Sequence, residues 1–360
     1  MSQKTSKIKS STSSEKVVKL SHREHVLKRP DSYIGSIDLT ESQQWILNQE
    51  ENKMNKKTLK YIPGEYKLFD ELIVNALDQQ VRLYERSLTD NSTQIVKNIK
   101  INVDQENGEI SIFNDGEGID TSMHNKEKKH IPELIFGDLL TSTNYNEDEI
   151  KHVGGKNGYG AKLVNIYSKK FTIETIDHIN KKKYIQSFYD NMTRKDKPKI
   201  TANKSKPYTK ITYNPDFEKF KTSGINDDMF KIMERRAFDM AAITGALVNV
   251  YFNGTKIDCK TFEKYVDLYI GSKKDTPRVY ERINPRWEVA ATLNPELIYE
   301  QVSFVNGINT SKGGKHVDYI ANQLANKLSK YIQKKKKITV KANYIKENLI
   351  VFVKATIDNP

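Results

Sequence analysis

Residues 69–76 read FDELIVNA and lie inside a longer segment, 66–86, whose apolar residues recur at helical spacing. Steps of one, three and four residues place these side chains on one stripe of an α-helix. The stripe is formed by Leu68, Phe69, Leu72, Ile73 and Ala76. Beside it, Glu71, Asn75 and Asp78 stand at i, i+4 and i+7, so they share a second face. That face is either a solvated helix surface or the wall of a site, in which a carboxylate is a general base and an amide oxygen binds a hard cation.

A strand that leads into NDGEGI, residues 114–119, is the second informative segment. Residues 99–103 and 109–113 alternate polar and apolar on either side of a turn, which predicts two adjacent strands. The two glycines that follow allow backbone to approach a ligand closely or to adopt positive φ. Asp115, at the strand end, can accept a hydrogen bond from an amino group such as that of adenine. An ordinary turn explains the same residues, so both interpretations stay open.

The third segment is GGKNGYG, residues 154–160, which leads into a helical pattern at 161–166. Backbone N–H groups in such a loop, together with the start of a helix, can bind phosphate oxygens. The segment matches neither the G-x-x-x-x-G-K-[ST] pattern nor the G-x-G-x-x-G dinucleotide pattern. A flexible glycine loop is the alternative to a phosphate-binding loop.

The composition restricts the class of protein. The chain has 360 residues, with 59 Lys and Arg against 46 Asp and Glu, and a formal net charge of +13. This excess suggests a polyanionic partner without proving one. No run of 18 apolar residues occurs and residues 1–16 are polar, so we expect neither a membrane span nor a secretory signal. The single cysteine, Cys259, excludes an internal disulfide, and the seven histidines show no metal-ligand spacing.

Strands and helices alternate irregularly along the chain, which favours an α+β layered fold over a doubly wound sheet. We expect a disordered tail at 1–16, a first domain at 17–255 and a second domain at 256–360. Further elements of the first domain are expected at 131–140 and 228–244 (helices) and at 171–176, 184–189 and 210–213 (strands). Those of the second domain are expected at 287–293, 301–306 and 349–356 (strands) and at 317–331 (a helix, followed by a lysine run).

The order of the three segments resembles the ATP site of the GHKL superfamily. Longer stretches are similar to the N-terminal region of the eukaryotic and large-DNA-virus type IIA DNA topoisomerases. They are EHVLKRPDSYIGS (24–36), FDELIVNA (69–76), HNKEKKHIPELIFGDLLTSTNY (124–145), GGKNGYGAKLVNIYS (154–168), RWEV (286–289) and FVNGINTSKGGKHVDYI (304–320). The resemblance implies a GHKL (Bergerat) ATPase sandwich, followed by a ribosomal-protein-S5-like transducer domain that is incomplete at its C-terminal end.

The resemblance also implies roles for single residues. Glu71 is then the general base that polarises the attacking water, Asn75 binds Mg²⁺, and Asp115 contacts the adenine amino group. The remaining ATP contacts, with Lys162 as a direct phosphate ligand, are Ser142, Thr143, Asn144, Gly155, Lys156, Asn157, Gly158, Tyr159, Gly160, Ala161 and Lys162. Gln79 replaces an expected Asn, which leaves its phosphate contact open. Tyr33 either reaches the nucleotide of a second subunit or is a packed surface aromatic.

The partners that the resemblance implies are a second copy of the chain and duplex DNA. ATP binding would close the homodimer around the duplex, and a cleavage domain or subunit of the same topoisomerase would break DNA. Lys334, Lys335, Lys336 and Lys337 match a lysine loop that approaches DNA, although a solvated charge run is the general alternative. The location would be the nucleus, or a host cell for a viral protein. Two other functions stay open: another GHKL ATPase, or a basic DNA-binding module with a vestigial nucleotide pocket.

The sequence ends before a Gln-Thr-Lys loop that the resemblance places shortly after residue 360. In the family, the lysine of that loop reaches the γ-phosphate of ATP. We therefore expect these 360 residues to bind Mg-ATP and to hydrolyse it poorly.

Overall fold

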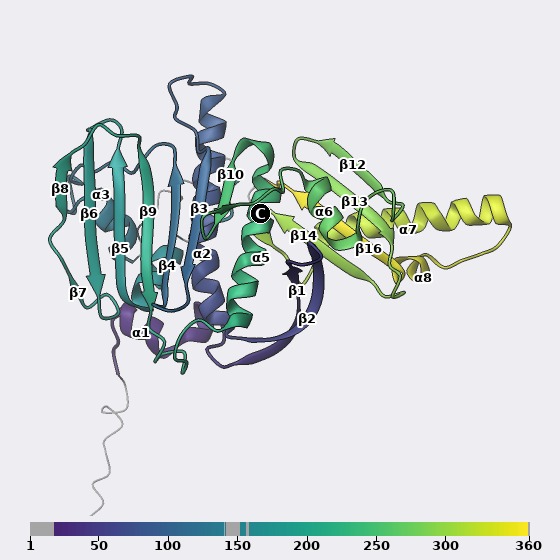
Figure 1. Ribbon diagram of the computed structural model, residues 1–360, viewed down its shortest axis with the longest axis horizontal. Helices are drawn as coiled ribbons and strands as arrows, with labels where there is room; N and C mark the ends of the chain where they lie inside the picture. The colour runs from purple at the N-terminus through teal and green to yellow at the C-terminus, as the bar shows by residue number, and fades with distance from the viewer. Residues whose placement is uncertain (1–17, 140, 142–151, 156–157, 359–360) are drawn as a thin grey trace, which may run out of the picture.

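The computed structural model describes residues 18–139, 141, 152–155 and 158–358. In this part of the chain, a nine-stranded sheet and a five-stranded sheet lie side by side, with a two-stranded hairpin between them (Figure 1). Helices and sheets form separate layers, so the predicted α+β class is confirmed.

The nine-stranded sheet runs in the order β11-β10-β3-β4-β9-β5-β6-β7, and β8 pairs with β6. Neighbouring strands are antiparallel except β10 and β3, which are parallel. The strands are β3 (Asn98–Asp104), β4 (Glu109–Asp115), β5 (Ser168–Asp177), β6 (Lys182–Tyr189), β7 (Arg194–Lys195), β8 (Lys199–Ala202), β9 (Tyr208–Pro215), β10 (Asn249–Phe252) and β11 (Thr255–Lys256). The predicted pair at 99–103 and 109–113 is confirmed as β3 and β4.

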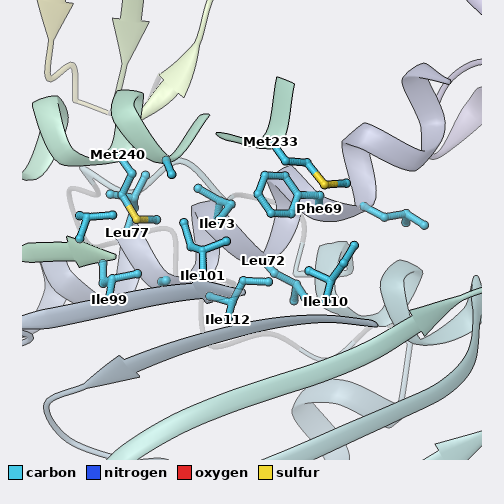
Figure 2. Packing of buried hydrophobic residues seen from close by; sticks show 14 of the residues in the cluster. Phe69, Leu72, Ile73, Leu77, Ile99, Ile101, Ile110, Ile112, Met233 and Met240 are labelled. Carbon is cyan, nitrogen blue, oxygen red and sulfur yellow. The ribbon is translucent and has the colours of Figure 1, made fainter. Parts of the chain in front are cut away.

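The predicted helix at 66–86 is confirmed as α2 (Pro63–Ser87). It begins at a proline, whose fixed φ suits the first helical turn and whose missing N–H would have no partner there. All five residues of the predicted apolar stripe are buried. Figure 2 shows α2 packed on β3 and β4, with Ile99, Ile101, Ile110 and Ile112 facing Leu72 and Ile73.

Other helices complete the layer over this face of the sheet. They are α3 (Ile131–Gly137), α4 (Gly160–Ile166) and α5 (Asp227–Thr244). Met233 and Met240 of α5 lie against α2, so α2 is enclosed between the sheet and α5 (Figure 2). Strand β3 alternates buried Ile99, Ile101 and Val103 with more exposed polar residues, because only one face of the sheet is covered.

The N-terminal region contains elements that the sequence analysis did not anticipate. Helix α1 (His22–Lys28) begins with a capping box, in which Ser21 and Glu24 satisfy each other's backbone N–H groups. A 3₁₀ turn (Pro30–Ser32) follows, and β1 (Thr40–Asn48) then pairs with β2 (Lys53–Tyr61) in an antiparallel hairpin. The S-x-x-E pattern at 21–24 is the signal that would have predicted α1.

The five-stranded sheet runs β12-β13-β16-β14-β15. Its strands are β12 (Val279–Asn284), β13 (Trp287–Leu293), β14 (Glu300–Val305), β15 (Ile308–Asn309) and β16 (Leu349–Ala355), and α6 (Phe262–Ile270), α7 (Lys315–Lys336) and α8 (Ala342–Lys346) accompany it. The first sheet ends at Lys256 and the second begins at Val279, so the expected boundary at 255–256 stays a prediction.

Helix α7 is longer than predicted and contains the start of the lysine run. Lys334, Lys335 and Lys336 form its last turn, and Lys337 ends it in the left-handed conformation. Lysine is a good helix former and a cation is favoured at a helix C-terminus, so the run extends the helix rather than following it. No helix among the described residues is long and apolar enough to cross a membrane.

Candidate functional site

One cavity of about 820 Å³ brings the three predicted segments together. Helix α2 forms one wall, strands β4 and β9 form the floor, and the glycine segment before α4 forms the opposite wall. The segments are far apart in the sequence, and the packing of α2 between sheet and α5 is what places them around one space. Their convergence favours a site over three unrelated surface features.

Glu71 and Asn75 both line the cavity from α2, one helical turn apart. The Glu71 carboxylate forms an ion pair with Lys67, in which Nζ and Oε1 are 2.6 Å apart. Burial opposes the charge on Lys67, but the neighbouring Glu71 carboxylate outweighs it and raises the pKa of Lys67. The charged ammonium of Lys67 therefore lies against the Glu71 side chain, which lines the cavity.

Glu71 also lies against the first residue of α4. A Cβ atom added to Gly160 would stand 1.9 Å from Glu71 Oε2 and 2.7 Å from its Cδ. The Glu71 carboxylate occupies the space in which a side chain at position 160 would begin, so any larger residue there must displace the carboxylate. The φ angle of Gly160 is not positive. The carboxylate therefore sits directly beside the N-terminus of α4.

Asp78, two turns further along α2, holds the start of the glycine segment. Its carboxylate oxygens accept hydrogen bonds from the N–H groups of Gly154 (2.8 Å) and Gly155 (2.9 Å). Burial raises the pKa of this carboxyl group, and the two backbone hydrogen bonds oppose that rise. Asp78 also lines the cavity, and this arrangement makes it an anchor for the loop.

The structure corrects the expectation for Asp115. Asp115 is not among the described residues that line the cavity. Its carboxylate instead accepts hydrogen bonds from the backbone N–H groups of Lys97 (2.7 Å) and Asn98 (2.8 Å) and from the Asn98 side chain (2.6 Å). Because side chains alternate along a strand, Asp115 points to the opposite face of β4 from its neighbour Asn114, which lines the cavity.

Sequence reasoning therefore missed Asn114. It lies directly across from Thr209 of β9, and Ile112 lies across from Ile211 in the same register. All four of these residues line the cavity and form an apolar floor with one amide and one hydroxyl group. Continued by one residue beyond the predicted end at 113, the alternation of β4 places Ile112 and Asn114 on one face, which is the signal that would have found Asn114.

The two glycines of the NDGEGI segment allow a backbone conformation and a close packing that a side chain would prevent. Gly116 has φ +91°, a region that side chains rarely adopt. A Cβ on Gly118 would lie 1.9 Å from the carbonyl oxygen of Ile176, so β5 itself occupies the space. The sequence predicted that the backbone here approaches a ligand closely. The group that it approaches is the neighbouring strand β5, and Gly118 also lines the cavity.

Lys162 lines the cavity from α4, and its ammonium group donates to two carbonyl oxygens. The acceptors are Thr141, at 2.6 Å, and Gly158. Burial lowers the pKa of Lys162 to about 8. The two hydrogen-bond acceptors of this buried ammonium are neutral and the Asp138 carboxylate only partly offsets the effect of burial, so an anion that enters the cavity is a favourable partner for it.

Other predicted residues of the glycine segment also line the cavity: Gly155, Gly158, Tyr159, Gly160 and Ala161. Gln79 lines it too, and its amide donates to the Glu117 carbonyl oxygen at 3.5 Å. The predictions for Ser142, Thr143, Asn144, Lys156 and Asn157 fall outside the described residues.

Tyr33 is not among the described residues that line the cavity. Its ring packs edge-on against Tyr159 of the glycine segment, with centroids 6.4 Å apart. Its hydroxyl group shares a 2.9 Å hydrogen bond with Nδ1 of His25. The structure therefore places Tyr33 on its own chain's glycine segment, which agrees with the packed-aromatic alternative and leaves a contact with a second subunit untested.

A junction beside the cavity joins the two sheets. His152 shares hydrogen bonds with Glu85 of α2 (2.5 Å) and with Asp358 beyond β16 (2.7 Å). These carboxylates, with Glu85 the larger influence, raise the pKa of His152. Arg286 also donates to Asp358, at 2.7 Å. The segment that leads into the glycine loop is thus tied to both α2 and the second sheet.

Asn75 and Glu71, two of the described residues that line the cavity, offer an amide and a carboxylate suited to a hard cation. Among the described residues, no group of three or more His, Cys, Asp or Glu side chains is arranged to hold a metal ion. This donor set fits Mg²⁺, which commonly takes one or two protein ligands together with phosphate oxygens and water.

The lysine run lies far from this cavity. The first half of helix α7 packs on β16, its C-terminal end extends away from both sheets, and the exposed Lys334–Lys337 stand at that outer end (Figure 1). These residues share nothing with the cavity, so any role they have is separate.

Comparison with known proteins places this geometry among related chains. The DNA gyrase B family matches residues 261–360. DNA topoisomerase 2 of Candida glabrata is 44% identical over 97% of this chain and 25% of its own length. Human DNA topoisomerase 2-alpha is 43% identical over 94% of this chain and 22% of its own length. The chain therefore spans about a quarter of the length of these curated relatives.

Solved structures agree with the sequence matches. The ATPase region of Saccharomyces cerevisiae topoisomerase II superposes with a TM-score of 0.87 at 42% identity, covering 97% of this chain and 88% of that one. The ATPase and transducer domains of Balamuthia mandrillaris topoisomerase II give 0.88 at 38% identity, covering 97% and 87%. The 43K ATPase domain of Thermus thermophilus gyrase B, at 19% identity, shares the fold with a TM-score of 0.56.

Proposed function

Because the chain belongs to the type II DNA topoisomerase family, in which it matches the ATPase region, we propose that its cavity binds and hydrolyses Mg-ATP. The observation that carries this proposal is the convergence of α2, β4 and the glycine segment on one cavity of about 820 Å³. A carboxylate, an amide, backbone N–H groups and a lysine surround that space, and phosphoryl transfer needs little more than such positioning and charge stabilisation.

Glu71 is the proposed general base, which takes a proton from the attacking water. Its carboxylate is held by Lys67 on one side and by the backbone of Gly160 on the other. A base fixed in this way loses little freedom when the water binds, because its position is already set by packing. Lys67 is the proposed positioning residue for Glu71.

The apolar floor is the proposed adenine site, and we propose Asn114 in place of Asp115 as the amino-group contact, because Asn114 lines the cavity. The Asn114 amide nitrogen donates to the Asp115 carbonyl oxygen at 2.9 Å, so its amide oxygen is the atom left to accept from an adenine amino group. Ile112 and Ile211 supply apolar surface for the ring from adjacent strands.

The glycine segment and Lys162 are the proposed phosphate contacts. Asp78 fixes the start of the segment through Gly154 and Gly155, so their backbone is set before ATP arrives. Asn75 would hold Mg²⁺, with Glu71 close by. When bound, the ion neutralises phosphate charge. Ser142, Thr143, Asn144, Lys156 and Asn157 stay proposed contacts on the basis of the resemblance.

We extend the proposal to the whole enzyme: ATP binding would close a homodimer of this region around duplex DNA, as part of a nuclear topoisomerase whose cleavage region breaks the DNA. The exposed cluster Lys334–Lys337 at the tip of α7 is the proposed DNA contact. Adjacent cations would contact phosphates without reading sequence, so DNA affinity should fall steeply with salt. Tyr33 stays the candidate contact with the partner's nucleotide.

A matched pair of variants tests the proposed chemistry. Glu71→Gln should bind a non-hydrolysable ATP analogue within about three-fold of the unaltered chain, and lose hydrolysis by about 10²–10⁴-fold, the usual contribution of a general base. Glu109→Gln, at an exposed carboxylate of β4, is the control. Sizing with the analogue tests dimerisation, and an unshifted elution would contradict the gate. Nucleotide binding lost in parallel with hydrolysis would assign Glu71 a structural role instead.

A further inference from the structure

The turn between β14 and β15 brings the second sheet into the ATP cavity. Ile308, the first residue of β15, lines the cavity although it belongs to the second sheet. A Cβ added to Gly154 would meet Ile308 Cγ1 at 3.0 Å and the Asn306 carbonyl oxygen at 3.1 Å. The glycine segment thus begins in close contact with this turn, and an added methyl group would have to displace its neighbours.

The turn is also bound to α2 from the other side. The Gly307 carbonyl oxygen accepts a 2.9 Å hydrogen bond from Arg236 of α5, whose Nε donates to Asp70 of α2 at 2.6 Å. Arg236 is fully buried. Gly307 has φ +80°, and a Cβ there would lie 3.1 Å from Leu77. The turn therefore packs on the helix that carries Glu71.

Its other contacts fix the turn to the centre of the second sheet. The Asn306 N–H donates to the Ala355 carbonyl oxygen at 3.0 Å. The Asn306 amide nitrogen donates to the Ile357 carbonyl oxygen at 2.9 Å, and its amide oxygen accepts from the Ile357 N–H at 2.8 Å. A shift of β16 relative to α2 would therefore also displace this turn.

We propose that the β14–β15 turn is a positioning element of the nucleotide site, in which Ile308 sets the position of the glycine segment at Gly154. This inference rests on the proposed ATP binding. It assigns the second sheet a part in nucleotide affinity, in addition to its packing against the first. The glycine segment is then held from two sides, by Asp78 on α2 and by Ile308 on β15.

A double-mutant cycle on nucleotide affinity tests the pair. Gly154→Ala forces its Cβ against Ile308, and the resulting displacement should raise the Kd by about ten-fold. Ile308→Ala removes the two side-chain atoms that oppose this Cβ and leaves the Asn306 carbonyl oxygen, and it should raise the Kd by about three-fold, because the segment loses most of its wall. In the double variant, the smaller side chain accommodates the added methyl group. Its Kd should therefore be about three-fold lower than that of Gly154→Ala alone.

The measurement is calorimetric titration of the 360-residue chain with Mg²⁺ and a non-hydrolysable ATP analogue. The matched controls are Gly224→Ala, where the added methyl group would meet nothing within 4 Å, and Ile283→Ala, at an exposed isoleucine of β12. Both should leave the Kd unchanged. Melting temperatures of all variants separate loss of folding from loss of affinity.

Three outcomes are distinguishable. Recovery of affinity in the double variant supports the positioning role. Additive losses, or single variants that bind as tightly as the unaltered chain, overturn it while leaving ATP binding intact. An unaltered chain that binds no analogue overturns the proposed function itself.

Discussion

Replacing Gly160 with alanine is the most specific perturbation that the site offers. The new methyl carbon would stand 1.9 Å from Glu71 Oε2 and 3.3 Å from its Cγ. Ordinary contact between such atoms needs about 3.5 Å, so the carboxylate must retreat by about 1.5 Å. The backbone does not oppose the substitution, since φ of Gly160 is not positive.

The retreat has a larger effect on catalysis than on stability. A displacement of about 1 Å in a reacting group can cost about 10² in rate, so Gly160→Ala should lower hydrolysis of Mg-ATP by at least about 100-fold. It also disturbs the Lys67–Glu71 ion pair, but a half-exposed pair of this kind is worth about 1 kcal/mol or less. Alanine is favoured over glycine in a helix by up to about 1 kcal/mol, so the two effects on stability nearly cancel.

Single-turnover hydrolysis, with protein in excess over radiolabelled ATP, measures the rate when turnover is slow. Binding of a non-hydrolysable analogue and the melting temperature are recorded on the same samples, and Gly224→Ala serves as a matched glycine-to-alanine control. Hydrolysis by Gly160→Ala within about three-fold of the unaltered chain would refute the argument, because the base would then tolerate displacement.

Three further results are expected. Because burial lowers the pKa of Lys162 to about 8, the ATP affinity of the unaltered chain should fall as pH rises from 7 to 9. Lys162→Met should bind ATP about ten-fold more weakly at pH 7, and its affinity should not change with pH over this range. Titration calorimetry measures both affinities. The two carboxylate partners raise the pKa of His152, so the charged imidazole stabilises the fold by about 1 kcal/mol or less, fully below pH 6.5 and progressively less as pH rises further. The free energies of unfolding of His152→Ala and of the unaltered chain, measured with urea, should therefore become equal at alkaline pH. A difference that stays constant with pH would contradict this. Arg236→Met leaves Asp70 buried without its partner and should lower the free energy of unfolding by about 3–5 kcal/mol, against a negligible change for the exposed Arg194→Met.

The long-range arrangement of the site was partly predictable because its local patterns are strong. The apolar stripe of 66–86 and the alternation of 99–113 predict α2, β3 and β4, and those elements form as expected. Helix α2 must bury its stripe on the sheet, so its polar face is directed along the sheet surface toward other segments. The pattern does not say which segments these are, and the resemblance to a known family supplied that information.

The residue that faces the cavity at the end of β4 shows why a strand boundary matters. A predicted strand of 109–113 ends before Asn114 and leaves no face assigned to it or to Asp115. The strand in fact continues through Asp115, and alternation then separates the two side chains onto opposite faces. The predicted boundary alone therefore could not tell which of the two side chains faces the cavity.

Contacts between the two sheets could not be predicted from local patterns. Ile308 follows a Val-Asn-Gly turn whose sequence indicates only a hairpin, and the wall that Ile308 forms depends on how the second sheet docks on α2. The same holds for His152, whose partners lie 67 and 206 residues away. Side chains of this kind acquire a role through tertiary packing, which periodicity does not encode.

Asp70 and Glu71 are neighbours in the chain, and successive helical residues point about 100° apart. Glu71 therefore faces the proposed phosphate site, while the Asp70 carboxylate contacts Arg236 and, through it, the β14–β15 turn. Two adjacent residues on one rigid helix thus carry the proposed base and the anchor of the second sheet. A rotation of α2 that improves one contact must change the other, so the position of the base and the docking of the second sheet are set together.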